Sequence, residues 1–113
     1  MRIFSIAPRA SVFVYSAPVN MSLGFPGLMK LVEKELKKKP LSGDLFLFVN
    51  KKRSYLKILF WAHAGWNIFA KKLPSGDFRE LSGEKLSIAE INSFVESITL
   101  DTRITKRTLK KAA

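Results

Sequence analysis

The sequence contains no cysteine, which excludes disulfide bonds, thiolate metal sites and cysteine nucleophiles. Histidine is nearly absent too: His63 is the one histidine, and it lies in an expected turn, where a solvated side chain is the commoner role. The nine acidic residues are scattered, whereas two-metal phosphoryl transfer needs several carboxylates that converge. We therefore predict that the protein is not an enzyme and uses no catalytic residue, metal or cofactor.

Long apolar runs are also missing. No stretch approaches the ~20 residues that a membrane-spanning helix needs. Pro8 and Arg9 interrupt the short apolar start, which makes it a poor signal peptide. A cysteine-free chain without these features is predicted to be cytoplasmic and to have no membrane partner.

Negative charge is scarce. Twenty Lys and Arg against nine Asp and Glu give a formal net charge of +11 on a chain of 12.8 kDa. Such a charge attracts polyanions, and nucleic acid is the commonest polyanionic partner of a soluble basic domain. An anionic membrane surface is the second alternative, and a basic composition without a polyanionic partner is the third.

The stretch from Asp44 to Leu81 predicts an antiparallel meander. Its apolar runs are separated by a polar loop and by two turns that contain glycine, and these gaps are too short for a crossover helix. The runs are residues 45–49, 55–62, 65–73 and 78–81. A further strand is expected at residues 11–16.

Two helices are predicted on either side of this meander. Pro26 suits the first turn of a helix that ends with the lysines at 37–39, before Pro40. These lysines either complement the helix dipole or extend a phosphate-binding patch. Ser87 and Glu90 have the spacing of a capping box. The second helix continues from them with an apolar stripe formed by Ile88, Ile91, Val95 and Ile98, with Phe94 beside it.

These elements predict an α+β fold, with an antiparallel sheet of about five strands and two packing helices in a single two-layer domain. The stripe of the second helix should pack on one face of the sheet. We expect the domain to span residues 1–100 and residues 101–113 to form a basic tail that is mobile in isolation.

Cationic side chains line the edges and tips of the predicted meander and continue into the tail. The candidate nucleic-acid-binding residues are Lys51, Lys52, Arg53, Lys57, Lys71, Lys72, Arg103, Lys106, Arg107, Lys110 and Lys111. Lysine outnumbers arginine, and no segment is typical of a recognition helix. We therefore expect contacts mainly with phosphate and little sequence specificity.

The strand at residues 55–62 divides by alternation into two faces. Its even-numbered residues are apolar and predicted to be core. The odd-numbered residues Tyr55, Lys57, Leu59 and Trp61 form a mixed face. On this face Tyr55 or Trp61 is a candidate for stacking on bases, although packing within the sheet is the commoner role of tryptophan.

The order of several short blocks resembles a known family. The blocks read GFxGL from Gly24, PxSGxLFxFxNKKR from Pro40 and KxLxW from Lys57. Between residues 11 and 99 the chain is similar to the small accessory protein of the insertion sequence 66 family, the second-reading-frame, TnpB-type transposition protein. The resemblance implies a non-catalytic helper, encoded beside a separate, larger transposase, that binds element DNA or that transposase.

Three positions depart from the family pattern. Asn20 and Ser22 stand where the family usually has Asp and Arg, and Ala62 stands where an Asp commonly follows the aromatic pair. One alternative is that those charged residues carry the family's function, and this copy is then altered or inactive. The other is that they only pair with each other structurally, and their replacement then has little effect on function.

The sequence thus predicts an accessory factor in the transposition of an insertion sequence. It would bind DNA, at the element ends or non-specifically, through a basic surface. The alternative is a protein-interaction module that docks on the separate transposase subunit through its aromatic sheet face.

Overall fold

The computed structural model describes residues 10–81, 85–96 and 98–99. The predicted tail at 101–113 lies outside these residues, so its mobility and the domain boundary at residue 100 stay predictions.

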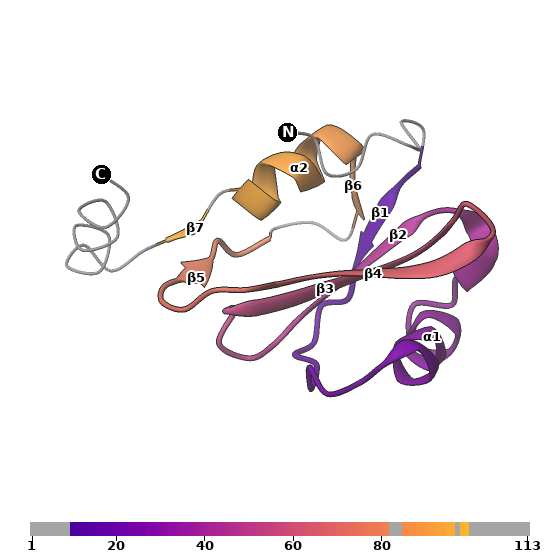
Figure 1. Cartoon of the computed structure of the whole chain (residues 1–113), viewed down its shortest axis with the longest axis horizontal. Helices are drawn as coiled ribbons and strands as arrows, with labels where there is room; N and C mark the ends of the chain where they lie inside the picture. The colour runs from indigo at the N-terminus through magenta and orange to yellow at the C-terminus, as the bar shows by residue number, and fades with distance from the viewer. Residues whose placement is uncertain (1–9, 82–84, 97, 100–113) are drawn as a thin grey trace.

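Five strands form one sheet in the order β4-β3-β2-β1-β6 (Figure 1). Their bounds are β1 Val12–Val14, β2 Leu45–Val49, β3 Tyr55–Ala62, β4 Gly65–Lys72 and β6 Lys85–Leu86. β2, β3 and β4 are antiparallel, as predicted, whereas β1 is parallel to β2. Parallel neighbours need a crossover, which α1 (Phe25–Lys34) and the 3-10 helix η1 (Pro40–Ser42) supply. The α+β class and the strand number are confirmed.

The fourth run of the predicted meander does not join this sheet. β5 (Asp77–Phe78) pairs instead with β7 (Ile98–Thr99) in a separate two-stranded sheet. The ring of Phe78 is fully buried, with its centroid 5.6 Å from that of Phe94 in the second helix. Burial of this ring, rather than continuation of the meander, therefore accounts for the position of the segment.

The two helices cover opposite faces of the sheet (Figure 1), so the domain has three layers rather than the predicted two. In β2, Leu45 and Leu47 belong to the core cluster beneath α2 (Ile88–Glu96), while Phe46 and Phe48 belong to the cluster beneath α1. A strand buried on both faces is apolar at every position. The uninterrupted apolar run of β2 is the sequence signal for the third layer.

α1 starts beside Pro26, as predicted, but ends earlier than expected. Lys34 is its last residue, and the backbone turns at Lys37, whose φ is 54°. The N–H of Lys38 then donates to the carbonyl of Val32 at 3.0 Å. The lysines at 37–39 therefore follow the helix, and their predicted place in its last turn is wrong.

The start of α2 confirms the predicted capping box. The N–H of Glu90 donates to Ser87 Oγ at 3.1 Å, and Glu90 Oε1 accepts from the N–H of Ser87 at 3.0 Å. The helix buries Ile91, Phe94 and Val95 on the face of the sheet opposite α1. Ile98, predicted on the same stripe, lies in β7 because the helix ends at Glu96.

The turn between β3 and β4 uses left-handed backbone at His63 (φ 55°) and Ala64 (φ 58°). Two central residues with positive φ are typical of a type I′ hairpin turn. Gly65, predicted to supply this conformation, is the first residue of β4 instead. In the next turn, Gly76 has φ 81°, as predicted.

Candidate nucleic-acid interface

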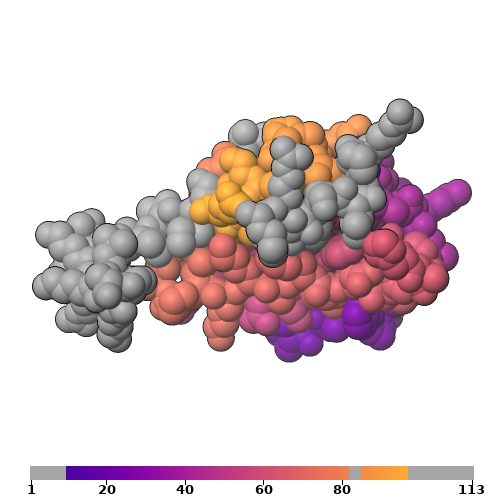
Figure 2. Space-filling view, turned by 45° about the horizontal axis from the view of Figure 1, so that its top comes forward, coloured from indigo at the N-terminus to yellow at the C-terminus, as the bar shows by residue number. Residues whose placement is uncertain are grey.

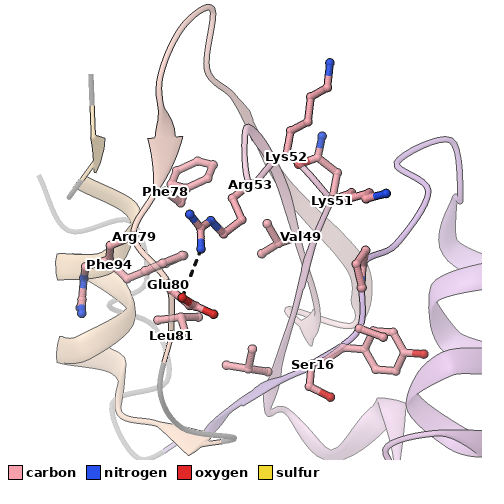
Figure 3. A pocket seen from close by; sticks show the side chains of 15 residues that line it. Ser16, Val49, Lys51, Lys52, Arg53, Phe78, Arg79, Glu80, Leu81 and Phe94 are labelled. Carbon is pink, nitrogen blue, oxygen red and sulfur yellow. Dashed lines mark ion pairs between the residues drawn. The ribbon is translucent and has the colours of Figure 1, made fainter. Parts of the chain in front are cut away.

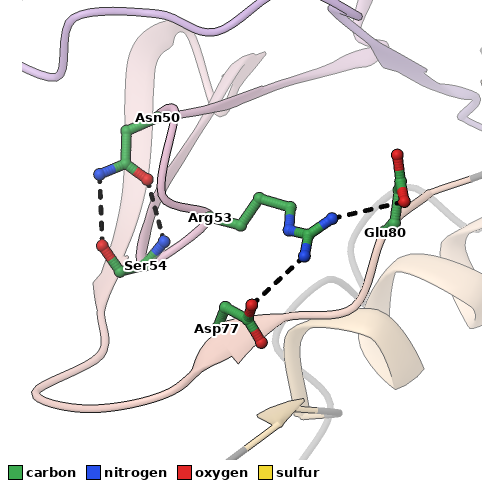
Figure 4. A network of polar contacts seen from close by, with 5 residues as sticks. All are labelled: Asn50, Arg53, Ser54, Asp77 and Glu80. Carbon is green, nitrogen blue, oxygen red and sulfur yellow. Dashed lines mark hydrogen bonds and ion pairs between the residues drawn. The ribbon is translucent and has the colours of Figure 1, made fainter.

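The β2–β3 loop is held in one conformation by the side chain of Asn50 (Figure 4). Asn50 Oδ1 accepts from the N–H groups of Ser54 at 2.9 Å and Tyr55 at 3.1 Å, and its Nδ2 donates to Ser54 Oγ at 3.3 Å. An asparagine that replaces backbone partners in this way stabilises a tight loop. The loop therefore presents Lys51 and Lys52 from a fixed base, and both lysines are exposed.

Arg53 has a different role from its two lysine neighbours. Its guanidinium lies 3.2 Å from Asp77 and 3.5 Å from Glu80 (Figure 4), and its carbonyl accepts from the N–H of Phe78 at 2.7 Å. Its backbone is left-handed, with φ 53°. Arg53 thus ties the loop to β5, and two carboxylates offset its charge. Its phosphate contact therefore stays a prediction, and the two neighbouring carboxylates make such a contact less favourable.

Tyr55 brings two of the predicted lysines together on the α1 face of the sheet. Lys57 Nζ lies 5.9 Å from the centre of the Tyr55 ring, and Lys72 Nζ lies 5.6 Å from it. Lys57 Nζ also donates to the carbonyl of Leu23 at 3.1 Å, which holds the amine without neutralising it. Trp61, the other predicted stacking residue, lies at the opposite end of β3. The lysines therefore gather around Tyr55.

Lys71 points to the other face of the sheet. Its Nζ donates to the carbonyl of Val95, in the last turn of α2, at 2.8 Å. A cation at this place complements the negative end of the helix dipole. Adjacent residues of a strand face opposite sides, so the predicted Lys71–Lys72 pair is divided between two faces.

A cleft of about 380 Å³ lies beside the basic loop (Figure 3). Its walls come from the end of β1, the β2–β3 loop and the segment after β5. In Figure 3, Lys51 and Lys52 extend away from the ring of Phe78, whereas Arg53 points toward Glu80. Arg79, which the sequence analysis did not single out, adds another cation to the lining.

The lysine run at 37–39 lies in a different place from this loop. Lys38 Nζ lies 4.5 Å from the centre of the Phe13 ring, and Lys85 Nζ lies 6.0 Å from the same ring. Both lysines line a second hollow, which shares residues 14–17 with the first. Sequence analysis missed Lys85 because only the pairing of β6 with β1 places it opposite Phe13.

The described residues contain no group of three or more His, Asp or Glu side chains placed to hold a metal ion. His63 is exposed at its turn. No helix among the described residues is long and apolar enough to cross a membrane. The predicted contacts in the tail lie outside the described residues and stay predictions, namely Arg103, Lys106, Arg107, Lys110 and Lys111.

The family profile described as IS66 Orf2 like protein matches residues 10–104. The chain belongs to this family. The match confirms the predicted family and covers every described strand and helix. Membership in the IS66 Orf2-like family indicates an accessory role in the transposition of insertion sequences.

Two proteins of Sinorhizobium fredii are similar to the chain. Uncharacterized protein y4hO is 36% identical over 78 residues, which cover 69% of this chain and 68% of that protein. Uncharacterized protein y4jC is 34% identical over 67 residues, 59% of this chain and 57% of that protein. The aligned region thus spans less than two thirds of y4jC. No solved structure matches the chain.

The positions that depart from the family pattern occupy two separate places. Asn20 Oδ1 accepts from the N–H of Ser22 at 2.9 Å in a turn before α1. This turn lies near the end of the sheet that carries the β2–β3 loop. The neighbouring Val19 N–H donates to Val49, the last residue of β2, whereas Ala62 ends β3 at the opposite end. A charge at position 62 would therefore lie too far from positions 20 and 22 for an ion pair.

Proposed function

We propose that the protein is a non-catalytic accessory factor in transposition that binds DNA through four lysines at one end of its sheet. These loop-end lysines are Lys51, Lys52, Lys57 and Lys72. One observation carries the proposal: all four lie at the β2–β3 loop end, and among the described residues none of them has a carboxylate within ion-pair distance. Family membership supports the transposition context.

The mechanism is electrostatic. Amines that have no ion-pair partner among the described residues neutralise DNA phosphates and release the counterions condensed on them, which is favourable at low salt. Lys51 and Lys52 extend into solvent from the loop that Asn50 stabilises, while Lys57 and Lys72 lie near Tyr55. Amine contacts of this kind position a protein on DNA without reading its sequence. Binding to element ends and to unrelated DNA therefore differs little.

A second candidate function is docking on the separate transposase. The cleft beside the loop favours it, since Val49 and Leu81 provide a half-buried apolar floor and Lys52 and Arg79 provide charge at its rim. Such a surface suits a peptide segment that is both apolar and acidic.

The test is a titration of element-end DNA and unrelated DNA of equal length at two salt concentrations. The Lys51→Ala/Lys52→Ala variant is compared with Lys30→Ala/Lys34→Ala, which removes two exposed charges from α1. We expect the loop variant to lower the slope of log affinity against log salt by about 2, and the helix variant to change it little. Equal slopes for both variants would reject the loop as the DNA contact. Transposase capture that persists in high salt after nuclease treatment would support the second function.

A further inference from the structure

β4 is the terminal strand of the five-stranded sheet, and no described strand pairs with its outer edge. It crosses in front of the other strands in Figure 1. In Figure 2 its atoms form a band across the face shown, between those of α2 and those of α1. The register between β3 and β4 is continuous from Tyr55↔Lys72 to Ala62↔Gly65, so no bulge interrupts the edge.

One hydrogen bond shows which groups face outward. The N–H of Leu73 donates to the carbonyl of Ser54 at 2.7 Å, one residue beyond the Tyr55↔Lys72 pair. Hydrogen-bonded and non-hydrogen-bonded pairs alternate along an antiparallel ladder. The odd-numbered residues of β4 therefore bond to β3. The even-numbered residues point their N–H and C=O groups away from the sheet, namely Trp66, Ile68, Ala70 and Lys72.

Among the described residues, this edge lacks the usual protection against pairing. Native edge strands are commonly short, bulged, or interrupted by proline or by charge. β4 has eight residues, contains no proline, and carries no charge before Lys71. The side chains of Trp66 and Ile68, whose backbone groups face outward, lie half-buried against the core beneath α1.

We propose that β4 pairs with β4 of a second copy of this chain, antiparallel about a two-fold axis. A second copy presents the same eight-residue edge without a bulge, so the two edges can pair symmetrically. The distribution of charge selects the direction, because the lysines occupy only one end of the strand. Parallel pairing would align the lysines of the two copies. In the antiparallel register centred on Phe69, Ile68 lies beside Ala70 of the second copy and Lys72 lies beside Trp66 of the second copy. Even-numbered side chains share one face, so this lysine can lie over the indole ring, where a cation is attracted.

The test measures the mass of the nuclease-treated full chain by sedimentation equilibrium over a concentration series in high salt. High salt screens the repulsion between two chains of charge +11. We expect a mass that approaches twice 12.8 kDa as concentration rises. The Ala70→Pro variant removes one outward N–H and leaves the bonds to β3 in place. It should associate at least about tenfold more weakly, while Ala70→Ser, which keeps the N–H, should associate like the native chain.

Two results would overturn the proposal. One is a native chain that stays at 12.8 kDa at every concentration, and this result does not depend on whether any variant folds. The other is a folded Ala70→Pro variant that still doubles its mass, because the contact would then lie elsewhere. Neither result rejects DNA binding, because Lys51, Lys52 and Lys57 lie outside β4 and only Lys72 would take part in both contacts.

Discussion

The guanidinium of Arg53 lies 3.2 Å from the carboxylate of Asp77, and this pair joins the basic loop to β5. Both side chains are partly exposed, at 40% and 37%. Solvent screening leaves such a pair about 0.5 kcal/mol of stabilisation. The larger consequence is electrostatic: a negative charge lies directly beside the loop that presents Lys51 and Lys52.

Asp77→Asn should tighten DNA binding. The change removes one negative charge near the phosphates and leaves Arg53 paired with Glu80 alone, so we expect affinity to rise about threefold at low salt, with a steeper salt dependence. The measurement is a fluorescence-anisotropy titration at two salt concentrations. Glu33→Gln is the control, because it makes the same change in net charge on the exposed surface of α1. Equal gains for both variants would mean that net charge, not this loop, governs the affinity.

Ala64→Gly should stabilise the fold. Ala64 has φ 58° in the β3–β4 turn, a conformation that costs a residue with a Cβ about 1 kcal/mol and glycine almost nothing. We expect the free energy of unfolding in urea to rise by about 0.5–1 kcal/mol. Ala62→Gly, in the extended strand before the turn, should lower it. A loss of stability in Ala64→Gly would contradict the left-handed turn.

Ser87→Ala should destabilise α2 and the core cluster beneath it. The substitution removes the hydroxyl that accepts from the N–H of Glu90, so we expect a loss of about 1 kcal/mol in urea unfolding. Ser93→Ala is the matched control, since Ser93 is an exposed residue of the same helix and alanine favours helix there. Equal effects at the two serines would argue against a capping role for Ser87.

Local patterns predicted several features of the fold correctly. Pro26 marked the start of α1, the Ser87–Glu90 spacing marked the cap of α2, and the β2–β3 loop was predicted at residues 50–54. Each depends on interactions within a few residues, which sequence spacing specifies. The continuous apolar run of β2 also held the signal for burial on both faces, but a short apolar run does not show by itself that its strand lies between two layers.

Other features depend on contacts between distant segments. Phe78 leaves the meander because it is buried beside Phe94, and Lys85 reaches Phe13 through strand pairing. The candidate site divides for the same reason. Arg53 contacts Asp77, which lies 24 residues away in the sequence. Alternation divides the lysines of β4 between two faces, but the surroundings of each face are set by the helix that covers it. Sequence spacing carries no information on these meetings.

Lys71 and Lys72 provide the sharpest test of the candidate site, because they are neighbours of equal charge on opposite faces. Lys71→Met leaves the carbonyl of Val95, in the last turn of α2, without its 2.8 Å donor, so we expect about 1 kcal/mol lower stability. DNA affinity should change little. Lys72→Met removes an exposed amine near Tyr55, so it should weaken DNA binding severalfold at low salt and leave stability almost unchanged.

The two variants carry the same change in net charge, so a binding mode that senses only the total charge of the protein would weaken both equally. That outcome, measured by anisotropy with urea unfolding on the same samples, would contradict the assignment of the DNA contact to one face. Different affinities with the opposite order would move the contact to the α2 face. The expected order, with Lys72 acting on affinity and Lys71 on stability, follows from the alternation of side chains along β4 and from the position of α2 over one face only.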